Sequence, residues 1–304
     1  MDCERVCLLL DDEWCPAYQL AAVQELAAHT AVEIPLVVLN DETFRLREQS
    51  PAYLARRLRS WGTWAPVCGA TTVSRAIRGP PAYDERHHYT TVDALDDAAV
   101  VRCSPIWQDD RWQSLPDPVV DTIAAESDVA IRFGFGLLTG RILGALEYGV
   151  LSFHLGDIRE YRGRIGALWE YLEDEPAAGV TLQQLTQRVD GGRIVAVDDV
   201  PIARRDTYGA VKRRQRSILG ALLVEGVQNL NDPDFEPKVP ETLGPYRSSP
   251  TVRELGRFLR KNGANVVRRV VASHPDSGSD SDSDSDSHSD SERETRRYQV
   301  NEFS

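Results

Sequence analysis

The sequence contains almost no lysine: three of its 35 basic residues are lysines, and the other 32 are arginines. It also has no basic surplus, because 47 Asp and Glu residues give a net charge of −12. Residues 276–304 carry half of that charge, with nine acidic residues against three arginines, and the rest of the chain remains acidic. An acidic body is not typical of a protein with a nucleic-acid-binding groove, so a nucleic-acid partner is disfavoured.

Paired cysteines and long hydrophobic runs are absent as well. The five cysteines form no CxxC pair and have no second cluster of ligands beside them, which indicates buried free thiols rather than a metal site or disulfide framework. No stretch reaches the ~18 apolar residues of a membrane span, and the first ten residues, MDCERVCLLL, do not have the pattern of a signal peptide. We therefore expect a cytoplasmic protein without a metal.

Two short apolar runs separated by a helical pattern open the chain. Residues 6–10 and 34–39 are continuous apolar runs, and the apolar residues of 17–28 recur at helical spacing. This strand–helix–strand order favours a parallel, doubly wound sheet. The turn after the first run, LLLDDEWCP, contains no glycine and therefore lacks the phosphate cradle of a dinucleotide site, which disfavours NAD binding.

The remaining apolar runs extend this α/β pattern. Further strands are predicted at 100–103, 128–133, 149–154, 179–185 and 194–201. Helices are predicted at 51–64, 119–126, 137–146, 165–172, 206–229 and 251–271. No helix separates the last two strands, so they must pair as a hairpin or edge pair. We expect a Rossmann-like, mixed but mainly parallel sheet flanked by helices.

Composition divides the chain into three predicted parts. Residues 1–205 form the α/β domain, and 206–272 form a C-terminal helical extension. Residues 273–304 contain DSGSDSDSDSDSHSDSE, which cannot bury apolar surface and is predicted to be a disordered acidic tail.

Residues able to carry chemistry are densest between 133 and 195. His154 ends an apolar strand and is followed by Gly156 and Asp157, so its imidazole lies where open α/β sheets build their sites. Asp190 precedes Gly191-Gly192, a turn at which a carboxylate can approach a ligand closely. Taken alone, a strand-end histidine is more often structural, and Asp before Gly-Gly is a common turn signature.

This run resembles the formyltransferase domain shared by glycinamide ribonucleotide, methionyl-tRNA and amino-sugar formyltransferases. The family pattern is Asn-x-His at a strand end, then YRG, a short helix, GVT, and Asp-x-Gly before an aliphatic pair. The matching elements here are Ser152-Phe153-His154, Tyr161-Arg162-Gly163, Gly179-Val180-Thr181 and Asp190-Gly191-Gly192. Order and spacing agree over about 70 residues, and 132–138, RFGFGLL, matches the strand and glycine turn that line the folate pocket. Residues 43–118 depart from the family.

The resemblance implies transfer of a formyl group from 10-formyltetrahydrofolate, a co-substrate, to a primary amine of a small metabolite or amino sugar. His154 would be the oxyanion donor and proton handler, and Asp190 would orient it and raise its pKa. The implied folate contacts are Phe133, Gly134, Phe135, Gly136, Leu137, Leu138, Val180 and Gly191. Arg159 and Arg162 are candidates to bind the acceptor, although local ion pairs with neighbouring carboxylates suit them equally.

Ser152 stands where the family has its asparagine. It is included in the predicted catalytic set, but a hydroxyl is shorter than an amide, and loss of a preorganised oxyanion donor costs on the order of 10²–10³ in turnover. A shifted substrate geometry, a donor supplied from elsewhere and a domain that binds without catalysing all remain open. The alternative functions are accordingly a formyl-folate hydrolase, a methionyl-tRNA formyltransferase and a catalytically silent folate or sugar sensor.

Overall fold

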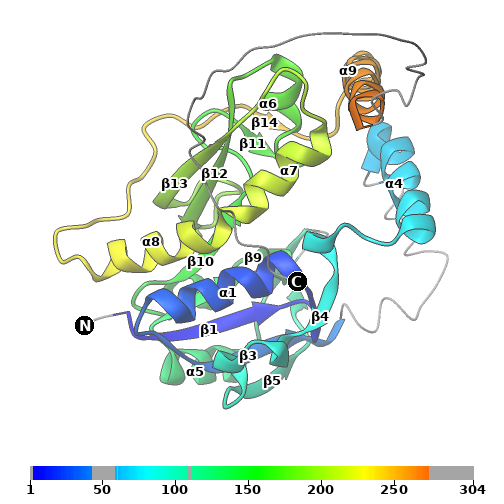
Figure 1. Ribbon diagram of the computed structural model, residues 1–304. Coiled ribbons are helices and arrows are strands. Elements are labelled where there is room, and N and C mark those ends of the chain that lie inside the picture. The colour runs from blue at the N-terminus through cyan, green and yellow to red at the C-terminus, as the bar shows by residue number, and fades with distance from the viewer. Residues whose placement is uncertain (1–2, 43–58, 60, 109–110, 274–304) are drawn as a thin grey trace, which may run out of the picture.

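The computed structural model describes residues 3–42, 59, 61–108 and 111–273. Its main sheet has seven strands in the order β13-β12-β10-β8-β1-β3-β5 (Figure 1). These strands are β1 (Arg5–Leu10), β3 (Glu33–Asn40), β5 (Ala99–Cys103), β8 (Val129–Arg132), β10 (Val150–His154), β12 (Ala177–Gln184) and β13 (Arg193–Pro201). β12 pairs antiparallel with both neighbours, and the other pairs are parallel. The predicted mixed, mainly parallel sheet is confirmed.

Helices cover both faces of this sheet. α1 (Ala17–His29) and α8 (Leu219–Asn231) lie on one face, and α5 (Asp117–Glu126) lies on the other (Figure 1). Alternate residues of β1 enter the two cores, with Leu8 packing toward α1 and Leu9 toward α5. The continuous apolar runs in the sequence follow from this, because a strand covered on both faces has no polar side.

Four further helices and three small sheets complete the described fold. The helices are α4 (Ala65–Arg78), α6 (Leu168–Glu173), α7 (Tyr208–Ser217) and α9 (Val252–Ser273), the last of which confirms a helical C-terminal segment. The small sheets pair β2 (Trp14–Pro16) with β4 (Arg86–His88), β6 (Ile106–Trp107) and β9 (Leu137–Leu138) with β7 (Trp112–Ser114), and β11 (Arg162–Gly163) with β14 (Tyr246–Arg247). The buried side chains of α8 pack in the same hydrophobic core as those of the main sheet. The domain boundary at residue 205 stays a prediction.

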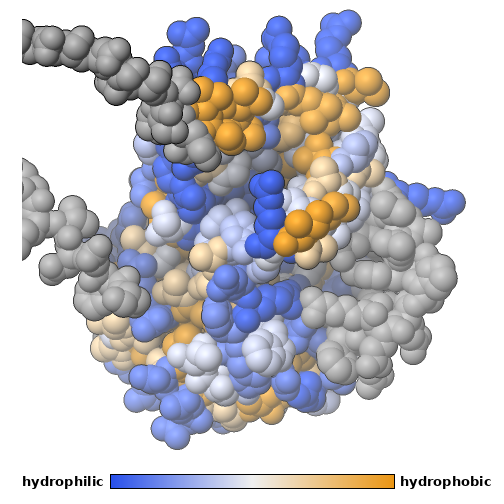
Figure 2. Space-filling model, turned by 45° about the vertical axis from the view of Figure 1, so that its right-hand side comes forward, coloured by the Kyte–Doolittle hydropathy of each residue, from blue (hydrophilic) through white to orange (hydrophobic). Residues whose placement is uncertain are grey.

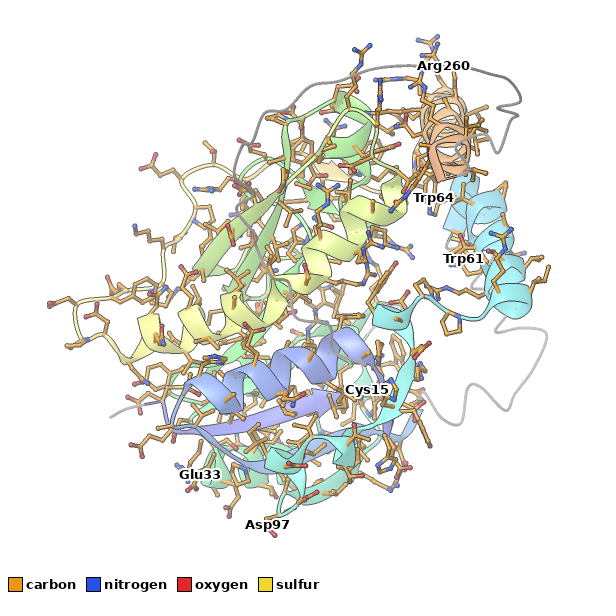
Figure 3. All side chains as sticks on the ribbon, in the orientation of Figure 1. Cys15, Glu33, Trp61, Trp64, Asp97 and Arg260 are labelled. Atoms are coloured by element: carbon orange, nitrogen blue, oxygen red, sulfur yellow. The ribbon has the colours of Figure 1, made fainter. Side chains whose placement is uncertain are left out.

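An aromatic cluster anchors α9 to the rest of the protein. The Trp64 ring lies 4.7 Å from that of Phe258 on α9, on the side of the molecule where Trp61 and Arg260 also lie (Figure 3). The outer face of α9 exposes apolar residues among arginines (Figure 2). No helix within the described ranges is long and apolar enough to cross a membrane.

Two predicted helices are wrong in detail. Residues 137–146 do not form a helix: β9 pairs there with β7, and only a short 3-10 turn follows at Arg141–Gly144. Long-range pairing thus overrides a local apolar pattern. Residues 206–229 form two helices that break at Ile218, where the Ser217 hydroxyl donates to the Arg214 carbonyl in competition with the backbone ladder. Most of the helix predicted at 51–64, and all of the predicted tail after 273, lie outside the described residues.

Gly179 on β12 permits close contact with the loop that follows β10. A Cβ at this position would lie 2.7 Å from the backbone nitrogen of Asp157. We predict that Gly179→Ala lowers the free energy of unfolding by about 1–3 kcal/mol, because backbone must move to admit the methyl group. In the matched control, Gly209→Ala, nothing lies within 4 Å of the new Cβ, and its place in α7 favours alanine. Urea unfolding compares the two; equal effects would contradict the close approach.

Candidate active site

Four polar side chains gather at the carboxyl edge of the main sheet. Arg132 and His154 are the last residues of β8 and β10, and Asp11 directly follows β1. The register places Arg132 beside Ser152 of β10 and beside Leu9 of β1. Because these three strands are parallel, they end at the same edge, where doubly wound sheets bind ligands. Asp190 comes to this edge from the connection between β12 and β13.

The structure brings His154 and Asp190 together. Nδ1 of His154 lies 3.5 Å from Oδ1 of Asp190, and their side chains are 10% and 19% exposed. Burial opposes a charge on His154, but the hydrogen bond and charge of Asp190 outweigh it and raise the histidine pKa above its ordinary value. Burial likewise opposes charge on Asp190, yet His154, the Gly163 N–H and Arg132 lower the pKa of the carboxyl. The pair therefore favours imidazolium and carboxylate.

The Tyr161-Arg162-Gly163 corner holds both members of this pair. Nε2 of His154 lies 2.9 Å from the Tyr161 carbonyl oxygen, and the Gly163 N–H donates to Oδ2 of Asp190 at 2.9 Å. Gly163 has φ +107, and a Cβ there would lie 1.8 Å from the Arg247 carbonyl oxygen of β14. Both ring nitrogens of His154 thus face acceptors, and the hollow beside the ring measures about 10 Å³.

The Ser152 hydroxyl is hydrogen-bonded to Arg132, a residue that the sequence pattern did not single out. The serine is 1% exposed, and its hydroxyl accepts from Nε and Nη2 of Arg132 at 3.2 and 2.8 Å. A charged residue at the end of a buried strand, in DVAIRF, was the available signal. Burial lowers the pKa of Arg132, while the charges of Asp11 and Asp190 oppose that shift. Among the described residues, no carboxylate lies within ion-pair distance of this guanidinium.

The residues implied to contact folate divide into two groups. Phe135, Leu138 and Val180 are at most 2% exposed within the two cores, so a contact with folate would be made by their backbone, and their role stays a prediction. The others lie nearer the surface or in backbone turns and keep their predicted role: Phe133, Gly134, Gly136, Leu137 and Gly191. Asp11 accepts from the Phe135 N–H at 2.7 Å and fixes the glycine turn to the end of β1.

A cavity of about 580 Å³ lies at the end of β9, the strand that follows this turn. It is lined by Trp112 and Ser114 of β7, by Thr139 and Gly140 after β9, and by Gln187 of the connection that also carries Asp190. Its volume is in the range of pockets for drug-sized ligands. Within the described residues, no group of three or more His, Cys, Asp or Glu side chains is arranged to hold a metal.

The two arginines predicted to bind an acceptor have local partners. Arg159 is half-exposed and forms a bidentate ion pair with Asp157, which is the local ion pair that its sequence context also suited. Arg162 donates to the carbonyl oxygens of Gly244 and Val189 at 2.6 and 3.4 Å. Arg162 therefore ties the corner to the Asp190 turn, and its role toward an acceptor stays a prediction.

Glu170 on α6 is a buried carboxyl close to His154. It is 2% exposed, its Oε1 has no hydrogen-bond partner in the described part of the chain, and burial raises its pKa to about 7. A pKa raised above the unfolded value of 4.5 stabilises the fold below pH 4.5, and that contribution is lost as the pH rises through 7.

We predict that Glu170→Gln reduces the pH dependence of stability. Between pH 4.5 and 8 the wild-type free energy of unfolding should fall by on the order of 3 kcal/mol more than that of the variant, as 1.36 kcal/mol per pKa unit gives. The raised pKa of His154 has the same sign but is present in both proteins, and the lowered pKa of Asp190 acts at lower pH. Urea unfolding at several pH values measures the slopes; identical slopes would exclude Glu170 as the titrating group.

Comparison with known proteins identifies the same segment of the chain. Residues 102–227 match the family model described as formyl transferase. Methionyl-tRNA formyltransferase of Listeria monocytogenes is 25% identical over 140 residues, or 46% of this chain and 44% of that protein. The Lactiplantibacillus plantarum enzyme is 22% identical over 194 residues, or 62% and 61%. The chain thus spans about half the length of the curated relatives it matches.

Two solved structures are also similar to this chain. A formyltetrahydrofolate deformylase from Pseudomonas syringae superposes with a TM-score of 0.51 at 15% identity, covering 80% of this chain and 67% of that one. A sugar N-formyltransferase from Shewanella gives a TM-score of 0.47 at 13% identity, covering 85% and 87%. Residues 102–227, which contain Arg132, the His154–Asp190 pair and the corner that holds it, are thus the part of this chain that matches the formyl transferase family model.

Proposed function

We propose that this protein transfers a formyl group from 10-formyltetrahydrofolate to a primary amine on a small metabolite or amino sugar. The observation that carries the proposal is the His154–Asp190 pair, held by the Tyr161–Gly163 corner at the carboxyl edge of the sheet. The pair lies in the segment that matches the formyl transferase family. The site provides positive charge beside a fixed carboxylate, which suits acyl transfer through an oxyanion.

The chemistry assigns complementary roles to the two residues. When the amine attacks the formyl carbon, negative charge develops on the formyl oxygen, and the proton lost by the amine finally resides on N10 of the folate. Asp190 raises the pKa of His154, which favours the protonated ring and so a positive charge near the oxygen on which the oxyanion forms. The Gly163 N–H and the Tyr161 carbonyl fix the geometry of the pair before substrate arrives.

The cavity at the end of β9 is the proposed folate site. Gln187, which lines it, belongs to the same connection between β12 and β13 as Asp190. Trp112 supplies an aromatic face for a flat heterocycle. Thr139 and Ser114 supply hydroxyl groups for hydrogen bonds.

A methionyl-tRNA acceptor is the second candidate, because basic side chains gather between α7 and α9. A hollow of about 770 Å³ there is lined by Arg205, Arg213, Arg214, Arg268 and Arg269 among others. Such a cluster on an acidic protein can attract a polyanion. The small acceptor is favoured because the overall charge is −12. In addition, the described residues after 205 form helices, apart from the two-residue strand β14 and loops.

We predict that the purified protein releases tetrahydrofolate from 10-formyltetrahydrofolate when an amino sugar or another small amine is added, and that His154→Ala abolishes the release. His29→Ala is the matched control, because His29 is exposed at the end of α1 and should leave the rate unchanged. Absorbance of the folate gives the rate, and mass spectrometry identifies the formylated product.

Each alternative gives a different result in this assay. Release with methionyl-tRNA alone would favour the second candidate, and release without any acceptor would indicate hydrolysis. Binding of folate without release under any condition would contradict the proposed transfer and support a sensor.

A further inference from the structure

We propose that Arg132 binds the negatively charged oxygen of the reaction, and that its guanidinium forms an anion site for a one-carbon carboxylate such as formate. The catalytic part of this inference rests on the proposed function, whereas the anion site does not. Ser152 stands at the position of the family's asparagine and has no N–H group. Arg132, which is hydrogen-bonded to Ser152, then supplies the N–H donor to the oxyanion.

The position of Arg132 carries the first step of the argument. The residue is the last of β8, between β1 and β10, and it pairs in register with Ser152. Its Nη2 lies 2.8 Å from the Ser152 hydroxyl oxygen, so the guanidinium reaches the side chain that replaces the amide. An N–H donor is therefore present beside Ser152, where the family has its asparagine amide, but this donor belongs to a residue of the neighbouring strand β8.

The other donors around the site are already engaged. Nε2 of His154 faces the Tyr161 carbonyl, the Gly163 N–H donates to Asp190, and the Phe135 N–H donates to Asp11. Arg132 uses Nε and Nη2 on Ser152, and its Nη1 has no partner among the residues that the structure describes. A partly buried guanidinium that still carries unused N–H groups can donate to an incoming oxygen.

The electrostatics of the edge support an anion at this point. Arg132 places a cationic group near Asp190, Asp190 raises the pKa of His154, and Asp11 is the other carboxylate whose charge acts on Arg132. Neither carboxylate approaches the guanidinium within ion-pair distance. A partly buried cation without a close counter-ion is costly for the fold, and an anion that binds there gains its full attraction.

The reaction step balances with Arg132 as a donor only. The amine nitrogen forms a bond to the formyl carbon, and the carbonyl π electrons move to the oxygen, whose negative charge the guanidinium N–H groups stabilise. The electron pair then returns, the bond from carbon to N10 breaks, and the proton released by the amine ends on N10. Arg132 keeps its own protons throughout.

Titration with ¹³C-formate tests the anion site without requiring turnover. We expect the wild type to bind formate, Arg132→Met to weaken binding at least tenfold, and Arg132→Lys to restore part of it, because lysine keeps the charge but loses the planar donor geometry. The control Arg5→Met removes an arginine at the opposite end of the neighbouring strand, paired with Asp128, and should leave formate binding unchanged.

Two results would overturn the anion site. One is unchanged formate binding by Arg132→Met, and the other is absence of formate binding by the wild type. Thermal unfolding checks that the variants fold; replacing an unpaired buried cation by methionine should not lower the midpoint. If Arg132→Met does not fold, Arg132→Gln, which keeps hydrogen-bond donors without charge, replaces it in the same titration.

Turnover tests the catalytic part separately. Where the wild type transfers formyl, Arg132→Met should lower kcat by on the order of 10²–10³ with a much smaller change in KM for folate, as expected of a donor acting on the oxyanion. An unchanged kcat would reject the catalytic role. A protein that binds formate through Arg132 but transfers no formyl would refute the proposed function and leave the anion site standing.

Discussion

Two backbone groups of one corner determine the geometry of the site. The Tyr161 carbonyl fixes the His154 ring, and the Gly163 N–H fixes the Asp190 carboxylate. These two hydrogen bonds hold both side chains in the orientation in which they face each other. Arg162, between them, binds the carbonyls of Gly244 and Val189. β14 closes the corner from behind, and therefore residues far apart in the chain support one pair of side chains.

The fold could be predicted from the sequence where burial is continuous. β1, β3 and β8 are apolar runs because both faces of the sheet are covered, and their shortness and the helical pattern between β1 and β3 favour strands. The prediction fails at 137–146, because β9 depends on pairing with β7 more than 20 residues away. Apolar spacing reports local periodicity and contains no information about such a partner.

Part of the candidate site could likewise be predicted from the sequence, and part could not. His154 and Asp190 could be identified because side-chain chemistry and spacing are visible in the sequence. The carbonyl that receives Nε2 is a backbone group, which every residue possesses, so no residue type marks it. Arg132 was missed for a different reason: its meaning depends on the neighbouring strand that places Ser152 beside it.

Serine and arginine at this edge are best understood as one unit. An asparagine amide could accept from the guanidinium only through its oxygen, and its NH₂ group would then remain a neutral donor. The Ser152 hydroxyl is smaller, and its oxygen accepts two N–H groups of Arg132 while keeping a proton to donate. With serine, the edge thus holds a full positive charge in place of an amide dipole.

A cation attracts an oxyanion more strongly than a neutral donor does, but its charge must be balanced when no anion is bound. Asp11 and Asp190 provide that balance from a distance, which leaves the guanidinium stable in the fold and still able to receive a charged oxygen.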